Sequence, residues 1–144
     1  PEIVLTIYGS HIDDKVRALE GPNLRIHGYV DSVAEVYQTA RVFVAPLISG
    51  AGIKGKVISA LAHGLPCVLS PVAAEGIGLK EGEEALIASS PARWAEATVT
   101  LYRDKNNWQK ISEASRAFTN RVFSFREGRE KMQRALETSG IQCY

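Results

Sequence analysis

The chain has 144 residues, 45% of them hydrophobic and 23% charged, and a formal net charge of +1 at pH 7. These values are ordinary for one globular domain, and the near-neutral charge excludes bulk electrostatic attraction to nucleic acid or to an anionic membrane. The two cysteines, Cys67 and Cys143, provide neither a disulfide framework nor the spacing of a metal site. The sequence shows neither a transmembrane-length apolar run nor a signal peptide, so we expect a cytoplasmic protein; the start at Pro1 suggests a segment of a longer one.

In chain order, the first part of the sequence alternates between short apolar runs and helical patterns. The apolar runs are rich in β-branched residues and end at glycine, proline or serine, which is typical of buried strands. Strands are predicted over residues 3–8, 24–30, 41–45, 66–69 and 85–88, and helices over residues 13–19, 33–40 and 54–62. Residues 71–76 are expected to form a loop.

After residue 90 the pattern becomes purely helical. Pro91 opens a helix through Leu101, in which apolar residues recur at helical spacing. Residues 104–107 are predicted to interrupt it, and two further helices follow over residues 108–118 and 126–137. The C-terminal helices therefore occupy about residues 91–138.

Strands that alternate with helices and are apolar on both faces predict an α/β fold, with a Rossmann-like parallel sheet covered by helices on both faces. We expect a single domain over residues 1–144. Ligands of such sheets bind beyond the carboxyl ends of the strands. The loops that follow Tyr8, Val30, Pro46 and Ser70 are therefore the candidate site.

The loop after Pro46 carries the clearest chemical signal. Gly50 and Gly52 allow backbone N–H groups to approach an anion, and the following helix adds its positive dipole end. Lys54 and Lys56 fall in the first helical turn, where the dipole disfavours cations. A negative ligand would compensate, so the pattern indicates anion binding.

The same loop allows two other interpretations. Gly50, Gly52 and Gly55 have the spacing of the dinucleotide fingerprint. In that fingerprint the first glycine directly follows its strand and an acidic residue ends the next strand. Here three residues separate Gly50 from Pro46, and the next strand ends in Ser70-Pro71. A nicotinamide-binding oxidoreductase fragment is therefore disfavoured. The remaining alternative is a surface loop with solvated lysines.

Several segments together resemble one enzyme family. They are residues 28–30, 42–46, 50–56, 60–68, 73–77 and 122–125, of which the block 50–68 is the most specific. In this pattern the chain resembles the group 1 glycosyltransferases, retaining enzymes of the GT-B fold that use nucleotide-diphosphate sugars. The resemblance spans nearly the whole chain and implies the C-terminal, donor-binding domain of such an enzyme.

The resemblance also implies roles for individual residues. Gly50, Gly52, Ile53 and the helix start would face the donor diphosphate, and Lys54 with Lys56 would neutralise the leaving nucleotide in place of a metal ion. Backbone at Val30 and Asp31 would border the nucleobase, Glu75 would lie near the sugar, and Ser59 would reach the ribose. No cofactor beyond the nucleotide-sugar donor is implied.

Family members commonly carry glutamates at the positions of Ala51 and Ser59. A serine hydroxyl binds a ribose more weakly than a carboxylate does, so Ser59 puts full activity in question. A non-catalytic binding module on the same fold is therefore kept as an alternative function.

The family's donor domain begins with a strand and helix before the segment that matches residues 3–10. Without them, the strands at residues 3–8 and 41–45 would flank a gap in the sheet. Either these strands close on one another, or a second copy pairs with the exposed edge to form a homo-oligomer. The missing acceptor domain is the other expected partner, and the full-length enzyme could be peripheral to the inner membrane.

The remaining polar and aromatic residues favour structural roles. His63 precedes the helix-ending Gly64 and is expected to cap the helix. Asp13 is expected to cap the first helix rather than form an acidic phosphate-receiving pocket. Trp94 and Trp108 are expected in the core, and the mixed charges of residues 126–134 on a solvated helix face.

Overall fold

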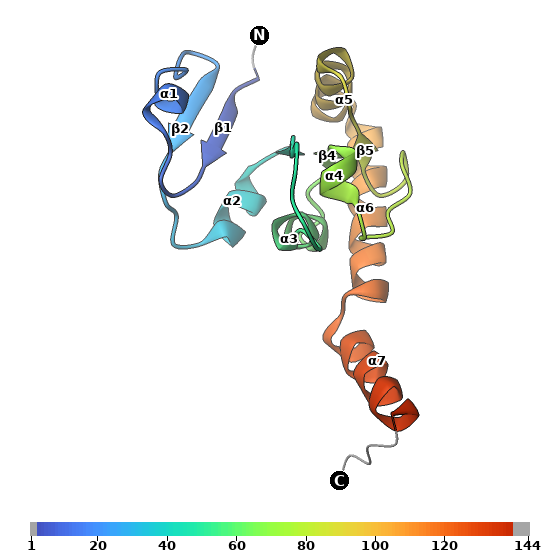
Figure 1. Ribbon diagram of the computed structural model, residues 1–144. Coiled ribbons are helices and arrows are strands. Elements are labelled where there is room, and N and C mark those ends of the chain that lie inside the picture. Colours follow the sequence, from blue (N-terminus) through green and yellow to red (C-terminus); the bar gives the residue numbers. More distant parts are fainter. Residues whose placement is uncertain (1–2, 140–144) are drawn as a thin grey trace. The chain divides into compact units, whose positions relative to one another are not determined.

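The computed structural model describes residues 3–139, so Cys143 lies outside it (Figure 1). The chain divides into two compact units, the first ending at Val36 and the second beginning at Tyr37. The helix α2 (Val33–Thr39) contains this boundary. Each unit holds one parallel sheet, and each is described by itself.

The N-terminal unit is a strand–helix–strand crossover. Strands β1 (Leu5–Tyr8) and β2 (Leu24–His27) pair in parallel, with Leu5 opposite Leu24 and Tyr8 opposite His27. The connecting helix α1 (Asp14–Arg17) begins after Asp13, whose carboxylate accepts the Lys15 amide at 2.7 Å. This contact confirms the predicted capping role of Asp13.

The C-terminal unit contains the strands β3 (Phe43–Ala45), β4 (Cys67–Leu69) and β5 (Leu86–Ile87), in the order β3-β4-β5 with all pairs parallel. Its helices are α3 (Gly55–Ala62), α4 (Pro71–Ala74), α5 (Pro91–Arg103), α6 (Lys105–Val122) and α7 (Phe125–Thr138). No helix within residues 3–139 combines the length and apolar character needed to cross a bilayer.

Two apolar clusters lie on opposite sides of β4, because successive strand residues point to opposite faces. Cys67 and Leu69 pack on one side with α3 and with Phe118 of α6. Val68 packs on the other side with Leu101 of α5 and with the beginning of α6. A sheet buried on both faces is what the continuous apolar runs predicted, and it confirms the α/β class with a parallel sheet.

Helix caps explain two differences from the predicted elements. The predicted interruption at residues 104–107 is wrong: Asp104 alone separates α5 from α6, because its carboxylate accepts the amides of Asn106 and Asn107 at 3.0 Å. The segment expected as a loop begins with the short helix α4, which Ser70 caps by accepting the Ala73 amide at 3.0 Å. Pro71 at its first position was a readable signal.

The tryptophans have different environments. Trp94 packs against the cluster around Val68, as predicted. Trp108 is half-buried outside both clusters, where its indole Nε1–H donates to the Arg41 carbonyl at 2.6 Å. The Arg41 guanidinium lies over the Trp108 and Tyr102 rings, at 5.5 and 5.8 Å from their centroids. The core placement expected for Trp108 is wrong because the indole N–H needs an acceptor, and the one it finds is the backbone that precedes β3.

Candidate functional site

The candidate site begins with the loop that follows β3. Gly52 has a φ of 71°, a conformation that glycine adopts without steric cost. At Gly50 a Cβ atom would lie 3.4 Å from Lys54 Cε, which is van der Waals contact with the flexible end of the lysine. The loop is exposed along its length, with Ile48 at 93% and Ile53 at 55% exposure. Gly50 also has a positive φ, of 153°, so both positions have a backbone conformation that strains residues other than glycine.

Lys54 ends this loop and precedes α3. The prediction that Lys54 lies in the first helical turn is wrong: α3 begins at Gly55, and Lys54 is the N-cap residue with an extended backbone. Its side chain is half-buried and folds back over the loop, where Nζ donates to the Gly52 carbonyl at 2.5 Å and the Gly50 carbonyl at 3.3 Å. The structure thus brings Gly50, Gly52 and Lys54 into contact.

Helix α3 presents Lys56 and Ser59 on one exposed face, three residues apart, while Val57, Ala60 and Leu61 face the core. Lys54 gives the first turn no side-chain cap, and that turn contains no acid. The helix dipole and the two lysines therefore combine into a positive N-terminus, which is the chemistry that attracts anions.

Tyr37 anchors the start of α3. Its hydroxyl donates to the Lys56 carbonyl at 3.1 Å, and its ring lies edge-on to Phe43 in β3 at 5.9 Å. Burial, and to a smaller extent the electrostatic interaction with Cys67, raise the pKa of the Tyr37 phenol, so it stays a protonated donor at neutral pH. No sequence pattern predicted this contact, because Tyr37 and Lys56 are 19 residues apart.

His63 closes the same helix. Its ring Nδ1 lies 2.8 Å from the Ser59 carbonyl, with the ring N–H as donor, and Gly64 follows with a φ of 70°. This confirms the structural role predicted for His63.

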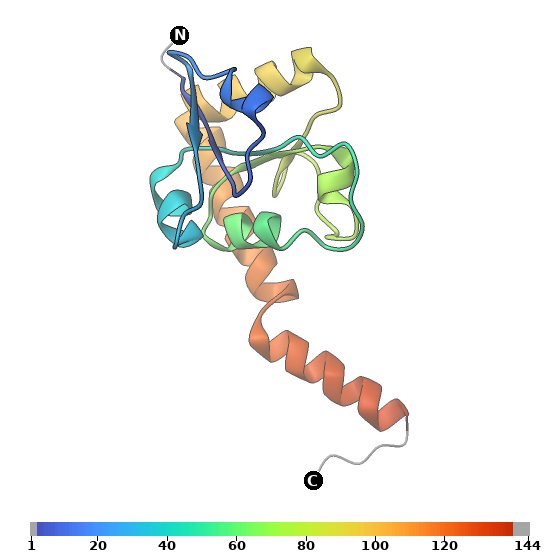
Figure 2. The same ribbon diagram turned by 60° about the vertical axis from the view of Figure 1, so that its left-hand side comes forward.

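The loop after β4 lies beside the glycine loop (Figure 2). A Cβ at Gly76, whose φ is 74°, would be 3.9 Å from Ile53 Cγ1. Glu75, which precedes Gly76, is exposed. Sequence reasoning named Ile53 and Glu75 but missed Gly76, although a glycine shortly after a strand end was available as a signal.

Val30 and Asp31 stand in the N-terminal unit, between β2 and α2, with Asp31 exposed. They are the two predicted site residues that belong to that unit. The other seven, Gly50, Gly52, Ile53, Lys54, Lys56, Ser59 and Glu75, belong to the C-terminal unit.

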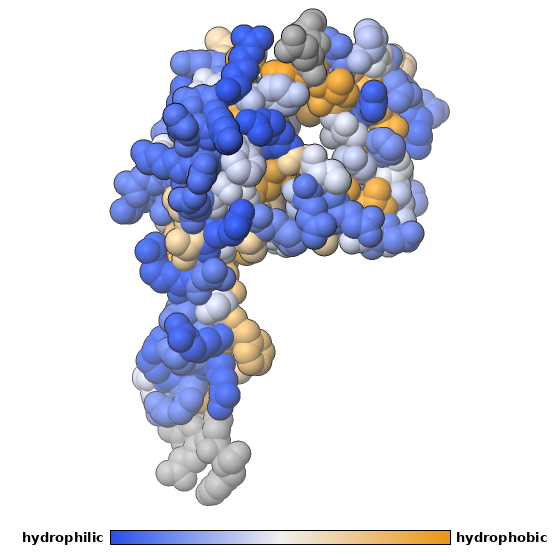
Figure 3. Space-filling model, turned by 180° about the vertical axis from the view of Figure 1, so that it is seen from behind, coloured by the Kyte–Doolittle hydropathy of each residue, from blue (hydrophilic) through white to orange (hydrophobic). Residues whose placement is uncertain are grey.

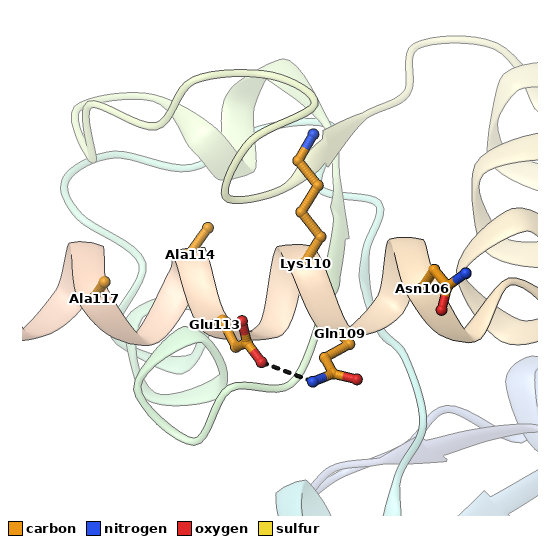
Figure 4. A pocket seen from close by; sticks show the side chains of 6 residues that line it. All are labelled: Asn106, Gln109, Lys110, Glu113, Ala114 and Ala117. Atoms are coloured by element: carbon orange, nitrogen blue, oxygen red, sulfur yellow. Dashed lines mark hydrogen bonds between the residues drawn. The ribbon is translucent and has the colours of Figure 1, made fainter.

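Two further features lie outside these loops. Among residues 3–139, no group of three His, Cys, Asp or Glu side chains is arranged to hold a metal ion. Figure 4 shows an open hollow lined by α6 alone, where the Gln109 amide donates to the Glu113 carboxylate at 2.9 Å. Its lining residues are Asn106, Gln109, Lys110, Glu113, Ala114 and Ala117, and none of them belongs to the candidate site.

Comparisons with known proteins concern the family and the fold of the chain. The chain is 23% identical to the uncharacterized 44.6 kDa protein in the cps region of Klebsiella pneumoniae, over 78% of this chain and 31% of that protein. Its fold matches Anabaena Alr3699/HepE in complex with UDP, with a TM-score of 0.85 at 12% identity, over 96% of this chain and 42% of HepE. It also matches sucrose-phosphate synthase from Thermosynechococcus elongatus, with a TM-score of 0.74 at 19% identity, over 93% of this chain and 38% of the synthase.

The chain spans less than half the length of each of these proteins. The structural matches show that it has the fold of GT-B glycosyltransferase domains. The family model of the group 1 glycosyl transferases matches residues 1–104. Because that model covers well over half of the sequence, this chain belongs to the group 1 glycosyl transferases.

Proposed function

We propose that the chain is the donor-binding half of an enzyme that transfers a sugar from a nucleotide-diphosphate sugar to an acceptor. We further propose that the reaction retains the anomeric configuration and needs no metal ion. Family membership supports sugar transfer, and HepE, whose fold is similar, was solved with UDP and with UDP-glucose. The observation that carries the proposal is the pair Lys54 and Lys56 at the dipole-positive start of α3, beside the glycine loop.

The chemical role of these lysines follows from where charge develops. As the bond between the sugar and the diphosphate breaks, negative charge accumulates on the departing nucleoside diphosphate. Fixed cations and backbone N–H groups stabilise that charge in the transition state without reorganising. Lys54 and Lys56 are therefore assigned to leaving-group stabilisation, and the loop at Gly50 and Gly52 to binding the diphosphate.

The other predicted site residues are also given proposed roles. Ser59 shares the exposed face of Lys56 and is proposed to bind the ribose, and the exposed Glu75, which precedes Gly76, is proposed to bind the sugar. Val30 and Asp31 are proposed to border the nucleobase.

The acceptor site is assigned to further sequence outside these 144 residues. This agrees with the 42% of HepE that the chain covers. On this view the chain alone binds a nucleotide weakly and transfers no sugar.

A thermal-shift panel with UDP, ADP, GDP and NAD tests the proposal. Binding to the folded state alone raises its stability by about 2.7 kcal/mol at a hundredfold excess of ligand over Kd. We expect a nucleoside diphosphate to raise the Tm of the chain and the Lys54→Ala variant to lose the shift. Lys110→Ala, which removes a lysine from α6, serves as the matched control and should keep the shift.

The other outcomes separate the alternatives. A chain indifferent to every nucleotide would favour the non-catalytic module, and a shift with NAD alone would revive the oxidoreductase fragment. In the longer protein, sugar transfer that survives replacement of both Lys54 and Lys56 would refute the leaving-group role. The anomer of the product and the effect of EDTA on the same assay test retention and metal independence.

A further inference from the structure

The Lys54 ammonium is engaged by the loop that it follows. It lies 2.5 Å from the Gly52 carbonyl oxygen and 3.3 Å from that of Gly50. Its Cε packs against Gly50, where a Cβ would approach to 3.4 Å. Both the charge and the stem of Lys54 therefore contact the loop.

The two bonds donated by Lys54 are the hydrogen bonds that the structure shows for the glycine loop. Within residues 46–53, which lie in the described part of the chain, no other backbone or side-chain hydrogen bond is present. Residues 47–53 are also all exposed to solvent. An exposed segment with so few internal bonds has little to oppose its conformational entropy. The two ammonium bonds are therefore the main polar restraint on the loop.

The direction of these bonds affects anion binding as well. A carbonyl oxygen that faces a phosphate repels it, whereas a backbone N–H attracts it. By binding two carbonyl oxygens, Lys54 offsets their negative dipoles on the loop that is proposed to face the diphosphate. An ammonium has three N–H donors, so one remains available for a ligand.

We propose that Lys54 is a positioning residue: it orders the glycine loop and masks the Gly50 and Gly52 carbonyls before any ligand binds. The ordering of the loop stands independently of the proposed function, whereas the benefit to a diphosphate rests on it. The loop is then preorganised, so less conformational entropy is lost when a ligand binds.

Backbone ¹⁵N relaxation of the whole chain tests the ordering. We expect order parameters of about 0.85 at Gly50 and Gly52 in the wild-type chain. In Lys54→Met, which keeps an unbranched apolar side chain but lacks the N–H donors, we expect values below about 0.6. Lys54→Arg, with charged donors, should restore part of the order. Lys56→Met removes the same charge two residues along, in the first turn of α3, and should leave the loop ordered. Unchanged β4 resonances show that each variant folds.

A titration with inorganic pyrophosphate, followed in the same spectra, separates this inference from the proposed function. A loop that loosens only in Lys54→Met supports the positioning role, whether or not pyrophosphate binds. If pyrophosphate shifts no loop resonance in the wild-type chain, the proposed function fails while the positioning role stands. If Lys54→Met is as ordered as the wild-type chain, the positioning role is overturned even where pyrophosphate binds.

Discussion

At the scale of single residues, Cys67 shows how tightly the sheet is packed. The thiol is fully buried at the start of β4, and burial raises its pKa because the thiolate cannot be hydrated there. Its Sγ lies 3.2 Å from the Leu65 carbonyl oxygen, which accepts the weak S–H bond. Such a thiol is an inert core group.

This raised pKa predicts an alkaline loss of stability. Below the ordinary thiol pKa of 9.0 both states are protonated and the contribution of Cys67 is fully present. Above it the unfolded chain ionises while the folded chain keeps its proton, so the free energy of unfolding falls by up to about 1.4 kcal/mol per pH unit. Tyr37, whose pKa is raised from 10.0, adds a further loss above pH 10.

Urea unfolding of the wild-type chain and of Cys67→Ala at pH 7.5, 9 and 10 checks this prediction. The variant loses packing and should be less stable at pH 7.5, but its stability should decline less between pH 9 and 10. If the free energy of unfolding fell equally in the two proteins, the thiol would have the same pKa in the folded and unfolded states, and the prediction would be wrong.

At the scale of elements, α7 differs from the other long helices because it buries none of its side chains. Phe125 and Met132 are 88% and 67% exposed, and Figure 3 shows apolar side chains on the surface of this helix. Arg126, Glu130 and Arg134 form exposed ion pairs along another face, and such pairs contribute little stability. The solvated, mixed-charge face predicted for residues 126–134 is confirmed.

Local capping should therefore matter more for α7 than for the helices of the core. Ser124 caps α7 by accepting the Glu127 amide at 3.2 Å, and Ser90 caps α5 by accepting the Arg93 amide at 3.3 Å. Replacing either serine by alanine removes about 1 kcal/mol of capping energy. In Ser124→Ala we expect ¹³Cα shifts of α7 to move toward coil values while the Tm stays unchanged.

The matched variant Ser90→Ala should lower the Tm, because α5 buries Ala97 and Leu101 in the core. A lower Tm in Ser124→Ala would mean that α7 unfolds together with the sheet.

At the scale of the whole molecule, burial is distributed unequally between the two units. No described side chain up to Val36 is fully buried, whereas β4 and its covering helices supply most of the core. Segments with few buried apolar contacts open at lower free energy than core strands.

Amide hydrogen exchange should reveal this difference. We expect the β1 and β2 amides to be protected at least about tenfold less than those of β4, which corresponds to about 1.4 kcal/mol. Equal protection in both sheets would indicate one cooperative unit and contradict the prediction.

The sequence by itself determined the parallel α/β fold, the order of the elements and the position of the glycine-lysine loop. It could do so because these features depend on local patterns: apolar periodicity, caps, and glycines at strand ends. The boundaries of β1 and α3 differ from the predicted ones by one or two residues. The larger errors, at Asp104 and Ser70, concern caps that were present in the sequence but not interpreted as caps.

The tertiary structure alone decided where the side chains of the site point. That the Lys54 ammonium turns back onto the loop depends on the left-handed backbone at Gly52 and on a lysine rotamer, neither of which sequence spacing determines. The proximity of Gly76 to Ile53 and the bond from Tyr37 to the Lys56 carbonyl join segments that are distant in the chain. Such contacts arise from packing across the sheet, and so they become visible only once the chain is folded.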